Sequence, residues 1–394
     1  MSASDKLGRS TLSVHAGERP NEIDALDAPL ILSNSFALGT ALEAEQAFLG
    51  ESSAYVYGRW RNPTVEQLEA KLASLEGAEA ACATASGMAA VSGALLAELR
   101  AGDHVVAPVA CYGETARLLR ERLPTLSIET TFVNASEGAQ AYRRALRPQT
   151  RVLYVETPAN PVLAVTDVAA VVALAREVGL PVIADNTFAT PYCQRPISMG
   201  VDVVVHSMTK ALGGHGDAIG GVACGSAERI TRMREVVVKS FGGVLAPFNA
   251  FLIARGMSTL ALRQAQACAT AARIAAFLES HAGVDRVFYP GLPGHPGHEI
   301  AARQMSAFGS LVAFELRGGI EAARQVLDRV RLITHAVSLG DVRSLITHPA
   351  TTTAASMPPE QRRLAGIGDG LVRLSVGIED CDDLLADLDS ALVP

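Results

Sequence analysis

Short apolar runs alternate with amphipathic helical stripes along the first two thirds of the chain. The runs are almost wholly apolar, which is typical of strands buried on both faces of a parallel sheet. We predict strands at residues 80–84, 105–107, 128–133, 152–155, 182–184 and 203–205, and helices at 65–75, 87–99, 112–123 and 168–178. This alternation predicts an α/β fold with a mostly parallel sheet covered by helices on both faces.

The pattern changes near residue 255. We predict a long helix at 259–280, strands at 311–316 and 372–376, and helices at 320–330 and 382–392, as in a smaller C-terminal α+β domain. A chain of 394 residues also exceeds one ordinary core. Residues 1–60 carry little periodicity and have no core of their own, so we expect them to pack on something else, such as a neighbouring subunit. We therefore expect an N-terminal arm (1–60), a large domain (61–255) and a C-terminal domain (256–394).

Composition and charge exclude several classes of protein. The net charge of −7 argues against a nucleic-acid partner, which needs basic surface to displace counterions. No apolar run has the length of a membrane span, and the first residues lack the apolar segment of a signal peptide. The six cysteines are scattered and form no Cys-x-x-Cys pair. We expect reduced thiols in a cytoplasmic protein, with neither a disulfide framework nor a metal site.

One stretch, residues 201–221, combines a buried strand with reactive side chains. The apolar run at 203–205 is followed by Ser207, Thr209 and Lys210, and then by a glycine-rich segment. An amine in this position can form a Schiff base, and the two hydroxyls can hold a phosphate. The alternative is a solvated lysine at a strand end followed by a flexible loop, because short motifs have high false-positive rates.

Other polar residues follow the remaining predicted strands. Gly87 and Met88 open a helix after the first strand, where backbone N–H groups can approach an anion. Tyr112 follows the second strand, and Asp185 follows the strand at 182–184. Taken singly, each has a structural explanation as a turn, a packing residue or a cap. Because ligands of open α/β sheets bind beyond the carboxyl ends of the strands, we expect these residues to share one edge.

Together these residues satisfy the requirements of pyridoxal 5′-phosphate. That cofactor needs a lysine, an anion beside its pyridinium nitrogen, a phosphate cradle and a group against its ring. A nicotinamide cofactor is a poorer match, because no G-x-G-x-x-G follows a strand, and the chain also lacks a G-x-x-x-x-G-K phosphate loop.

Motifs throughout the chain resemble the Cys/Met-metabolism enzymes that depend on pyridoxal phosphate. This family includes cystathionine γ-synthases, cystathionine lyases, methionine γ-lyases and O-acylhomoserine sulfhydrylases. The resemblance extends from about residue 15 to residue 392 and implies a fold-type-I, aminotransferase-like architecture. It rests on YGRWRNPT (57–64), ASGMAA (85–90), CYGET (111–115), ETPANP (156–161), ADNTFATP (184–191), HSMTKALGGHGD (206–217), AVSLGD (336–341), THPATT (347–352) and VRLSVGIED (372–380).

The resemblance implies a role for each residue of the cofactor site. Lys210 would form the imine and transfer protons, Asp185 would pair with the pyridinium nitrogen, and Tyr112 would stack on the ring and act as acid or base. The phosphate would be held by Gly87, Met88, Ser207 and Thr209 of one subunit and by Tyr57 and Arg59 of its neighbour. The resemblance therefore also implies an active dimer, with two such dimers forming a homotetramer.

On the substrate side, the resemblance implies that Arg373 holds the α-carboxylate, a bidentate task suited to guanidinium. Asn160 and Ser338 would line the same side. Glu114 and Arg343 occupy positions where other members of the family carry different residues, and we expect them near the distal end of the substrate. There they could pair with each other, bind a polar γ-substituent, or remain as solvated residues at the rim.

The branch of the family is less determined than the cofactor chemistry. HGD (215–217), SLGD (338–341) and the closing segment 372–388 are similar to methionine γ-lyases, whereas PFNA (247–250) is similar to the sulfhydrylases. We predict γ-elimination on a γ-substituted amino acid, sulfur-containing or derived from homoserine, giving a 2-oxo acid and ammonia. The alternative is γ-replacement, as in an O-acylhomoserine sulfhydrylase or a cystathionine γ-synthase. A binding module without catalysis is disfavoured because Lys210, Asp185, Tyr112 and Arg373 are all present.

Overall fold

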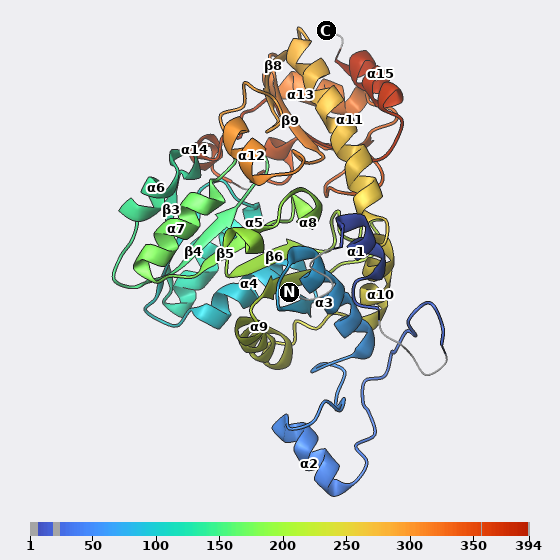
Figure 1. Cartoon of the computed structure of the whole chain (residues 1–394). Helices are drawn as coiled ribbons and strands as arrows, with labels where there is room; N and C mark the ends of the chain where they lie inside the picture. The colour runs from blue at the N-terminus through green and yellow to red at the C-terminus, as the bar shows by residue number, and fades with distance from the viewer. Residues whose placement is uncertain (1–6, 19–23, 356, 393–394) are drawn as a thin grey trace.

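The computed structural model of the chain describes residues 7–18, 24–355 and 357–392, and two sheets organise it (Figure 1). The large sheet has seven strands in the order β1-β7-β6-β5-β4-β2-β3. These strands are β1 (Ala80–Thr84), β2 (His104–Pro108), β3 (Glu129–Val133), β4 (Thr150–Glu156), β5 (Val182–Asp185), β6 (Val203–Ser207) and β7 (Gly221–Gly225).

The second sheet comes from the last third of the chain and lies at the top of Figure 1. It has five strands in the order β10-β11-β12-β9-β8. They are β8 (Val284–Phe288), β9 (Leu311–Leu316), β10 (Thr334–His335), β11 (Leu345–Thr347) and β12 (Leu371–Ser375). The two sheets thus draw their strands from either side of the expected boundary near residue 255, while the division into domains stays a prediction.

Helices cover both sheets (Figure 1). Those associated with the first 257 residues are α1 (Arg9–His15), α2 (Ala41–Leu49), α3 (Pro63–Glu76), α4 (Gly87–Glu98), α5 (Gly113–Arg117), α6 (Ala139–Arg144), α7 (Val168–Val178), α8 (Thr190–Cys193), α9 (Ala227–Met233) and α10 (Pro247–Met257). The others are α11 (Leu260–Ser280), α12 (His298–Gln304), α13 (Gly319–Arg329), α14 (Pro359–Leu364) and α15 (Cys381–Ala391). Helix α3 begins where expected, because the Asn62 side chain accepts hydrogen bonds from the N–H groups of Thr64 and Val65.

The predicted α/β class is confirmed, and the large sheet is mostly parallel. Strands β3, β2, β4, β5 and β6 run parallel, so their carboxyl ends meet at one edge. Strand β7 is antiparallel to both β1 and β6 and was not predicted. Its sequence, GVACG, begins and ends with glycine and follows a glycine-rich segment, so the apolar signal was too short to indicate a strand.

The helix predicted at 112–123 is wrong in its details. Tyr112 is the residue before the helix, and α5 covers only Gly113–Arg117. A wider π-helical turn (Leu118–Arg122) and a 3₁₀ turn (Leu123–Leu126) then continue the chain. Pro124 lies in the 3₁₀ turn and cannot donate the backbone hydrogen bond that a continuing α-helix would require there. The predicted position of Tyr112, beyond the end of β2, is nevertheless correct.

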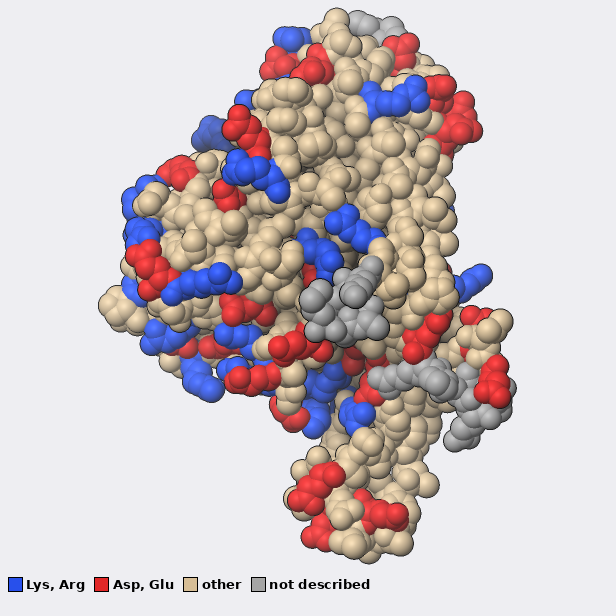
Figure 2. Space-filling view, in the orientation of Figure 1, with Lys and Arg blue, Asp and Glu red and all other residues tan. Residues whose placement is uncertain are grey.

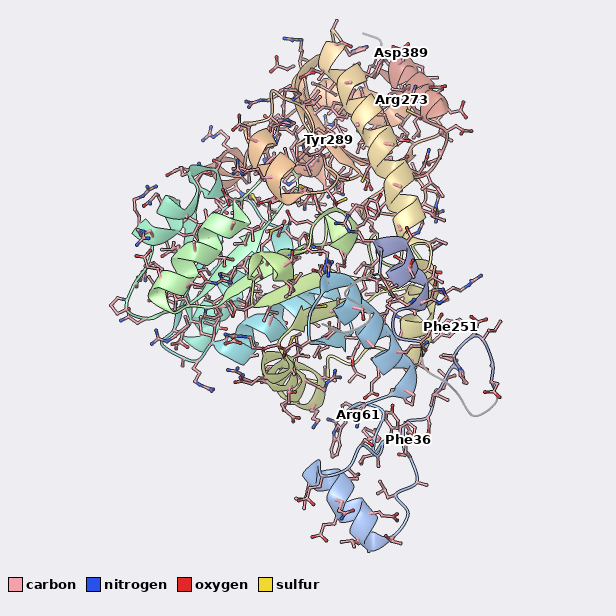
Figure 3. The ribbon with its side chains drawn as sticks, viewed as in Figure 1. Phe36, Arg61, Phe251, Arg273, Tyr289 and Asp389 are labelled. Atoms are coloured by element: carbon pink, nitrogen blue, oxygen red, sulfur yellow. The ribbon has the colours of Figure 1, made fainter. Side chains whose placement is uncertain are left out.

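The arm, defined here as the described residues 24–62, extends away from the body at the bottom of Figure 1. Its helix α2 has no buried residue. In Figure 3, Phe36 and Arg61 mark the place where the arm joins the body. There the ring of Tyr55 packs on Phe36, with 5.2 Å between centroids, and lies 5.0 Å from the guanidinium carbon of Arg61. No helix among the described residues is both long and apolar enough to span a bilayer.

Candidate active site

A cavity of about 410 Å³ lies beyond the carboxyl ends of β4, β5 and β6. Helices α4 and α5 and loops of the C-terminal part of the chain complete its walls. Its lining residues are Ser86, Gly87, Met88, Val91, Tyr112, Thr115, Glu156, Asn160, Asp185, Thr187, Phe188, Ser207, Thr209, Lys210, Val337, Ser338, Leu339, Thr353 and Arg373. A cavity thus lies at the carboxyl edge of the sheet, where the strand pattern predicts the site. Ten of the predicted site residues line it.

One end of the cavity is built to receive an anion. Gly87 is the first residue of α4, and the side chain of Ser86 caps that helix by accepting the N–H of Ala89. A Cβ atom at Gly87 would lie 2.8 Å from the Cβ of Ser207, so only glycine lets the two segments approach this closely. Ser207 and Thr209 lie beside this helix N-terminus, where the dipole favours negative charge.

Two buried carboxyl groups stand side by side on neighbouring strands. Glu156 and Asp185 are opposite each other in the register of β4 and β5. Burial and the neighbouring Asp185 raise the pKa of Glu156 to about 8. Burial also raises the pKa of Asp185, but hydrogen bonding from Thr187 and the charge of His206 act in the opposite direction. Two adjacent buried carboxylates cannot both ionise easily, so this pair favours a single negative charge.

Lys210 is half-buried and lies three residues after the end of β6. Its Nζ atom donates a 2.7 Å hydrogen bond to the hydroxyl of Ser338, which comes from the C-terminal part of the chain. Burial, with a contribution from Arg373, lowers the pKa of Lys210 to about 8. A lysine with a lowered pKa has a larger neutral fraction, which is the form that attacks a carbonyl.

Arg373 enters the cavity from β12 with its guanidinium almost completely buried. Nη1 donates to Asn160 Oδ1 at 2.9 Å, and Nη2 donates to the backbone oxygen of Ser338 at 2.8 Å. Burial lowers the pKa of Arg373 to about 10. Its Nε–H has no acceptor among the described residues. Two neutral acceptors therefore hold the Arg373 side chain in place. They do not neutralise its positive charge, and they leave its Nε–H without a partner.

Tyr112 reaches the cavity from the turn before α5, and its side chain is partly exposed. Its backbone N–H donates to Glu156 Oε2 at 2.8 Å, and the N–H of Asn160 donates to Oε1 of the same carboxyl at 3.0 Å. Burial, then Glu114 and Glu156, raise the pKa of the Tyr112 phenol. A raised pKa keeps the phenol protonated at neutral pH, as a general acid requires.

Four predicted residues lie outside the cavity of this chain. Tyr57 and Arg59 belong to the arm, with the Arg59 guanidinium 5.5 Å from the Tyr57 ring. Glu114 forms an ion pair of 3.9 Å with Arg117, and Arg343 forms one of 3.3 Å with Asp341. The expectation that Glu114 and Arg343 could pair with each other is corrected, because each has an oppositely charged neighbour close in sequence.

Sequence reasoning assigned no role to several lining residues, above all Glu156 and Thr187. Glu156 binds the backbone of both Tyr112 and Asn160, and Thr187 donates its N–H to Asp185 at 2.9 Å. The signal for Glu156 was its place at a strand end next to the strand of Asp185. Val337 and Thr353 carried no such signal, since they come from loops without periodicity.

The geometry fits pyridoxal phosphate residue by residue. Four features fit: the close approach that Gly87 permits, the carboxyl of Asp185 at the end of β5, the amine of Lys210 with its lowered pKa, and the helix N-terminus for a phosphate. A sheet of this topology with such a site defines a fold-type-I enzyme dependent on that cofactor.

Comparison with known proteins gives the family. The family model described as "Cys/Met metabolism PLP-dependent enzyme" matches residues 10–393, and the chain belongs to this family. It is 44% identical over 389 residues to an L-methionine gamma-lyase of Fusobacterium nucleatum subsp. polymorphum, covering 98% of each protein. It is 43% identical over 392 residues to an O-succinylhomoserine sulfhydrylase of Mycobacterium tuberculosis, covering 98% of this chain and 96% of the relative.

A solved structure gives the same result. The crystal structure of cystathionine gamma synthase from Xanthomonas oryzae pv. oryzae, in complex with aminoacrylate and cysteine, has a TM-score of 0.92 and 38% identity to this chain, with 98% of each chain covered. The predicted family, fold type and cofactor are therefore confirmed: the protein is a pyridoxal-phosphate-dependent enzyme of Cys/Met metabolism.

Proposed function

We propose that this enzyme catalyses γ-elimination on a γ-substituted amino acid with a neutral γ-substituent, such as the thioether of L-methionine. The observation that carries the proposal is the distribution of charge around the cavity. Among its lining residues only Glu156, Asp185, Lys210, Arg373 and the phenol of Tyr112 are ionisable, and the phenol is neutral at neutral pH. In this proposal Asp185 and Lys210 act at the cofactor, Arg373 at the α-carboxylate, and Glu156 on backbone groups, so this chain presents no further charge to a charged γ-substituent.

In this proposal Arg373 binds the substrate α-carboxylate. Its Nη atoms are held by Asn160 and Ser338, which fixes the plane of the guanidinium before the substrate arrives. The Nε–H is free to donate, and a charge-assisted hydrogen bond to a carboxylate is stronger than a neutral one. Asn160 would keep the guanidinium in place rather than bind the carboxylate itself.

Bound pyridoxal phosphate would supply the electron sink, with Lys210 as its covalent anchor and Asp185 beside its ring nitrogen. Gly87, Met88, Ser207 and Thr209 would surround its phosphate. Once displaced by the substrate amine, Nζ of Lys210 would carry protons between carbon atoms of the substrate. Ser338 would hold Nζ near that path through the 2.7 Å hydrogen bond.

Tyr112 would donate the proton of its phenol to the leaving γ-substituent. Its raised pKa keeps that proton available at neutral pH. The backbone N–H of Tyr112 is held by Glu156, which would fix the ring relative to the cavity. Glu156 would therefore act through Tyr112 and Asn160 rather than on the substrate.

Two such subunits would build each active site. Tyr57 and Arg59 lie outside the cavity of their own chain, on an arm whose helix has no buried residue. We place them at the phosphate of a neighbouring subunit, which the arm would reach across the subunit interface. The arrangement implies an active dimer, and we propose that two dimers form a tetramer.

The alternative function is γ-replacement, in which a thiol adds at Cγ after the leaving group departs. It is favoured by the M. tuberculosis sulfhydrylase, whose 43% identity is close to the 44% of the gamma-lyase. The residues around the cofactor serve both reactions until that step. The choice depends on whether water or a thiol reaches the intermediate first.

Incubation of the purified holoenzyme with L-methionine, and separately with O-succinyl-L-homoserine, would test the proposal. Each reaction is run with and without sulfide, and 2-oxo acid, ammonia and amino-acid products are measured. We expect 2-oxo acid from methionine without an added thiol. A strict thiol requirement, with a new amino acid as the product, would overturn γ-elimination in favour of replacement.

A further inference from the structure

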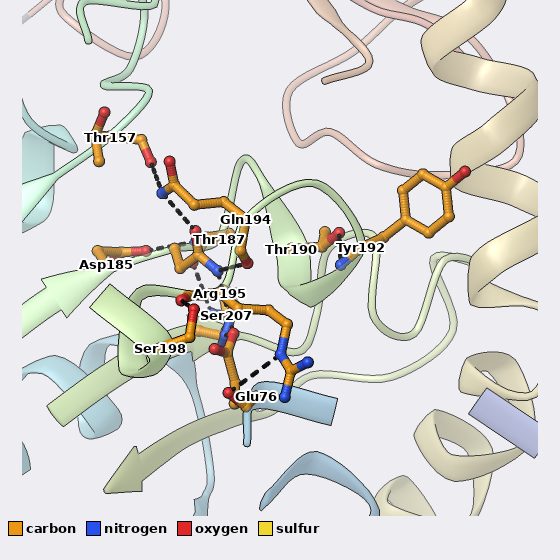
Figure 4. Close-up of polar contacts among 12 residues, drawn as sticks. Glu76, Thr157, Asp185, Thr187, Thr190, Tyr192, Gln194, Arg195, Ser198 and Ser207 are labelled. Carbon is orange, nitrogen blue, oxygen red and sulfur yellow. Dashed lines mark hydrogen bonds and ion pairs between the residues drawn. The ribbon is translucent and has the colours of Figure 1, made fainter. Parts of the chain in front are cut away.

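A buried polar cluster lies at the end of α3, next to the strand ends that carry Asp185 and Ser207 (Figure 4). Glu76 is the last residue of that helix, and its carboxyl is completely buried. Oε1 of Glu76 is 2.6 Å from Nε2 of His206, and it also accepts a hydrogen bond of 3.1 Å from Nδ2 of Asn186. None of these three side chains lines the cavity.

The two donors to Glu76 come from different strands of the sheet. Asn186 directly follows Asp185 at the end of β5, and His206 directly precedes Ser207 in β6. A single carboxyl oxygen thus ties together the ends of two strands. The cavity residues next to Asn186 and His206 are Asp185, proposed to pair with the ring nitrogen, and Ser207, proposed to hold the phosphate. The ring nitrogen and the phosphate are at different ends of one cofactor, so the distance between Asp185 and Ser207 must match it.

The rest of the cluster keeps Asn186 in one orientation. Its Nδ2 also donates to the backbone oxygen of Gln194 at 2.9 Å, and its Oδ1 accepts from Nε2 of Gln194 at 3.1 Å. Gln194 also donates to the backbone oxygen of Thr157, at 3.3 Å (Figure 4). Nε of the Arg195 side chain donates to the backbone oxygen of Glu76, the last carbonyl of α3, at 3.4 Å. Removal of Glu76 would therefore leave Nδ2 of Asn186 with one acceptor instead of two, and it would remove the acceptor that Asn186 shares with His206.

A direct link connects the same two strand ends on the cavity side. The N–H of Thr187 donates to Asp185, and the N–H of Ser207 donates to the Thr187 hydroxyl at 2.9 Å. This link is partly accessible from the cavity, whereas the link through Glu76 is fully buried. Hydrogen bonds to a buried charge are stronger than those between neutral groups, and their loss leaves donors without partners.

We propose that Glu76 is a positioning residue of the cofactor site: by binding both His206 and Asn186 it fixes the spacing between Ser207 and Asp185. The inference rests on the proposed roles of Asp185 and Ser207 at the cofactor. Glu76 also holds the His206 ring in place through Nε2.

The alternative is a purely structural role, in which Glu76 stabilises the sheet without affecting the cofactor. Glu69 provides the matched control, because it is a buried carboxylate on the same helix, bound to Arg234 at 2.8 Å and to the N–H of Ala83 at 2.7 Å. It does not contact the strand ends of β5 or β6. Its removal should lower stability to a similar degree and leave the cofactor site intact.

The test is the equilibrium dissociation constant of pyridoxal phosphate, measured by visible absorbance as the holoenzyme is diluted, together with the melting temperature. Removing a residue behind a first layer of metal ligands typically costs ~10–100-fold in affinity, and we expect the same for Glu76→Ala. Glu76→Gln, which keeps an acceptor oxygen, should lose less, within about fivefold on that scale. Glu69→Ala should lower the melting temperature with unchanged affinity.

Equal affinity of wild type, Glu76→Ala and Glu69→Ala would overturn the proposal. If Glu76→Ala does not fold, His206→Gln and His206→Leu make the same test, because only glutamine keeps a donor near the Nε2 position. The proposal then requires weak binding by the leucine variant alone, and equal binding by both variants would overturn it. Asp185→Asn distinguishes failure of the proposed function from failure of this inference. Normal affinity of Asp185→Asn for pyridoxal phosphate would refute the role of Asp185. Weak affinity of Asp185→Asn, together with normal affinity of Glu76→Ala, would refute the role of Glu76.

Discussion

The cavity and the N-terminal arm obtain their order in different ways. In the cavity, Arg373 and Asp185 are enclosed by strands and loops of their own chain, and burial shifts their pKa values. On the arm, Phe48 and Leu49 expose 59% and 65% of their surface. On the face that Figure 2 shows, the lobe that holds α2 is tan and red, that is, uncharged and acidic. The lining of the cavity described above comes from one chain, whereas the same chain leaves these apolar side chains of the arm largely exposed.

This difference separates two kinds of mutation. Changes within the cavity should alter activity without altering how far the subunits assemble, because the residues that line it belong to the fold of one chain. Changes in the arm should act through assembly and should depend on protein concentration. The following experiments test that separation, from the largest expected effect to the smallest.

Lys210→Ala should have the largest effect. Loss of a group that transfers protons typically lowers the rate by about 10²–10⁴-fold, and this variant also loses the covalent anchor of the cofactor. The measurements are kcat for 2-oxo acid formation and the visible absorbance of the bound cofactor. Lys71→Ala is the control, because Lys71 is buried but donates to the backbone oxygens of Ser13 and Val14, away from the cavity. The control Lys71→Ala should be less stable than wild type and should keep its cofactor. Near-normal turnover by Lys210→Ala would refute the assignment of Lys210 to the active site.

Arg373→Lys should have the next largest effect. An ammonium cannot replace the planar set of donors that binds Asn160, Ser338 and a carboxylate together. Truncating one partner of a buried charge contact costs ~2–5 kcal/mol, so kcat/KM should fall by about 100-fold, mostly through KM. In the control Arg234→Lys, a guanidinium bound to Glu69 is replaced, and KM should not change. An unchanged KM for Arg373→Lys would show that the α-carboxylate binds elsewhere.

Arg59→Ala tests the arm. If Arg59 reaches the phosphate of a neighbouring subunit, the loss of one charged contact worth ~1.5–3 kcal/mol should weaken cofactor binding by about tenfold or more. Cofactor affinity of Arg59→Ala and wild type is measured over a range of subunit concentrations, with the assembly followed by sedimentation. Arg61→Ala is the matched control, since Arg61 binds Glu66 and stacks on Tyr55 where the arm joins the body. Equal weakening by both variants would indicate loss of arm structure rather than loss of a phosphate contact.

The cavity could be predicted from the sequence because parallel strands place their carboxyl ends together. Asp185 and Lys210 had to be neighbours, although they are 25 positions apart in the sequence. Strand β7 and the role of Glu156 were missed, because a five-residue strand with glycine at both ends has a weak pattern and a carboxyl that binds backbone groups has none. The turn at Tyr112 was misassigned as helix because periodicity does not show where a helix gives way to wider turns.

The cavity also predicts a pH dependence in the protein without cofactor. Burial lowers the pKa of Lys210 from 10.5 to about 8, so between these values the unfolded chain binds more protons than the folded one. The contribution of Lys210 to stability therefore rises with pH across this window and is most unfavourable below about pH 8. Lys210→Met without cofactor should melt a few degrees higher than wild type at pH 7, and the difference should shrink towards pH 10.5. A difference that stays constant with pH would show that the amine is not desolvated.

Glu114→Gly should have the smallest effect, although Glu114 is only two residues from Tyr112. Its side chain is 57% exposed and forms an ion pair with Arg117, and an exposed pair of this kind contributes ~0–1 kcal/mol. We expect the relative rates on methionine, cystathionine and O-succinylhomoserine to stay within about twofold of wild type, because a charge so well hydrated cannot discriminate strongly between substrates. Glu121→Gly is the control, since Glu121 pairs with the same arginine at 3.1 Å and lies seven residues further along the chain. A selective loss of activity on cystathionine in Glu114→Gly alone would mean that Glu114 binds the distal ammonium group of cystathionine. The cavity would then extend further towards solvent than the single chain shows, and the neighbouring subunit would cover that part of it.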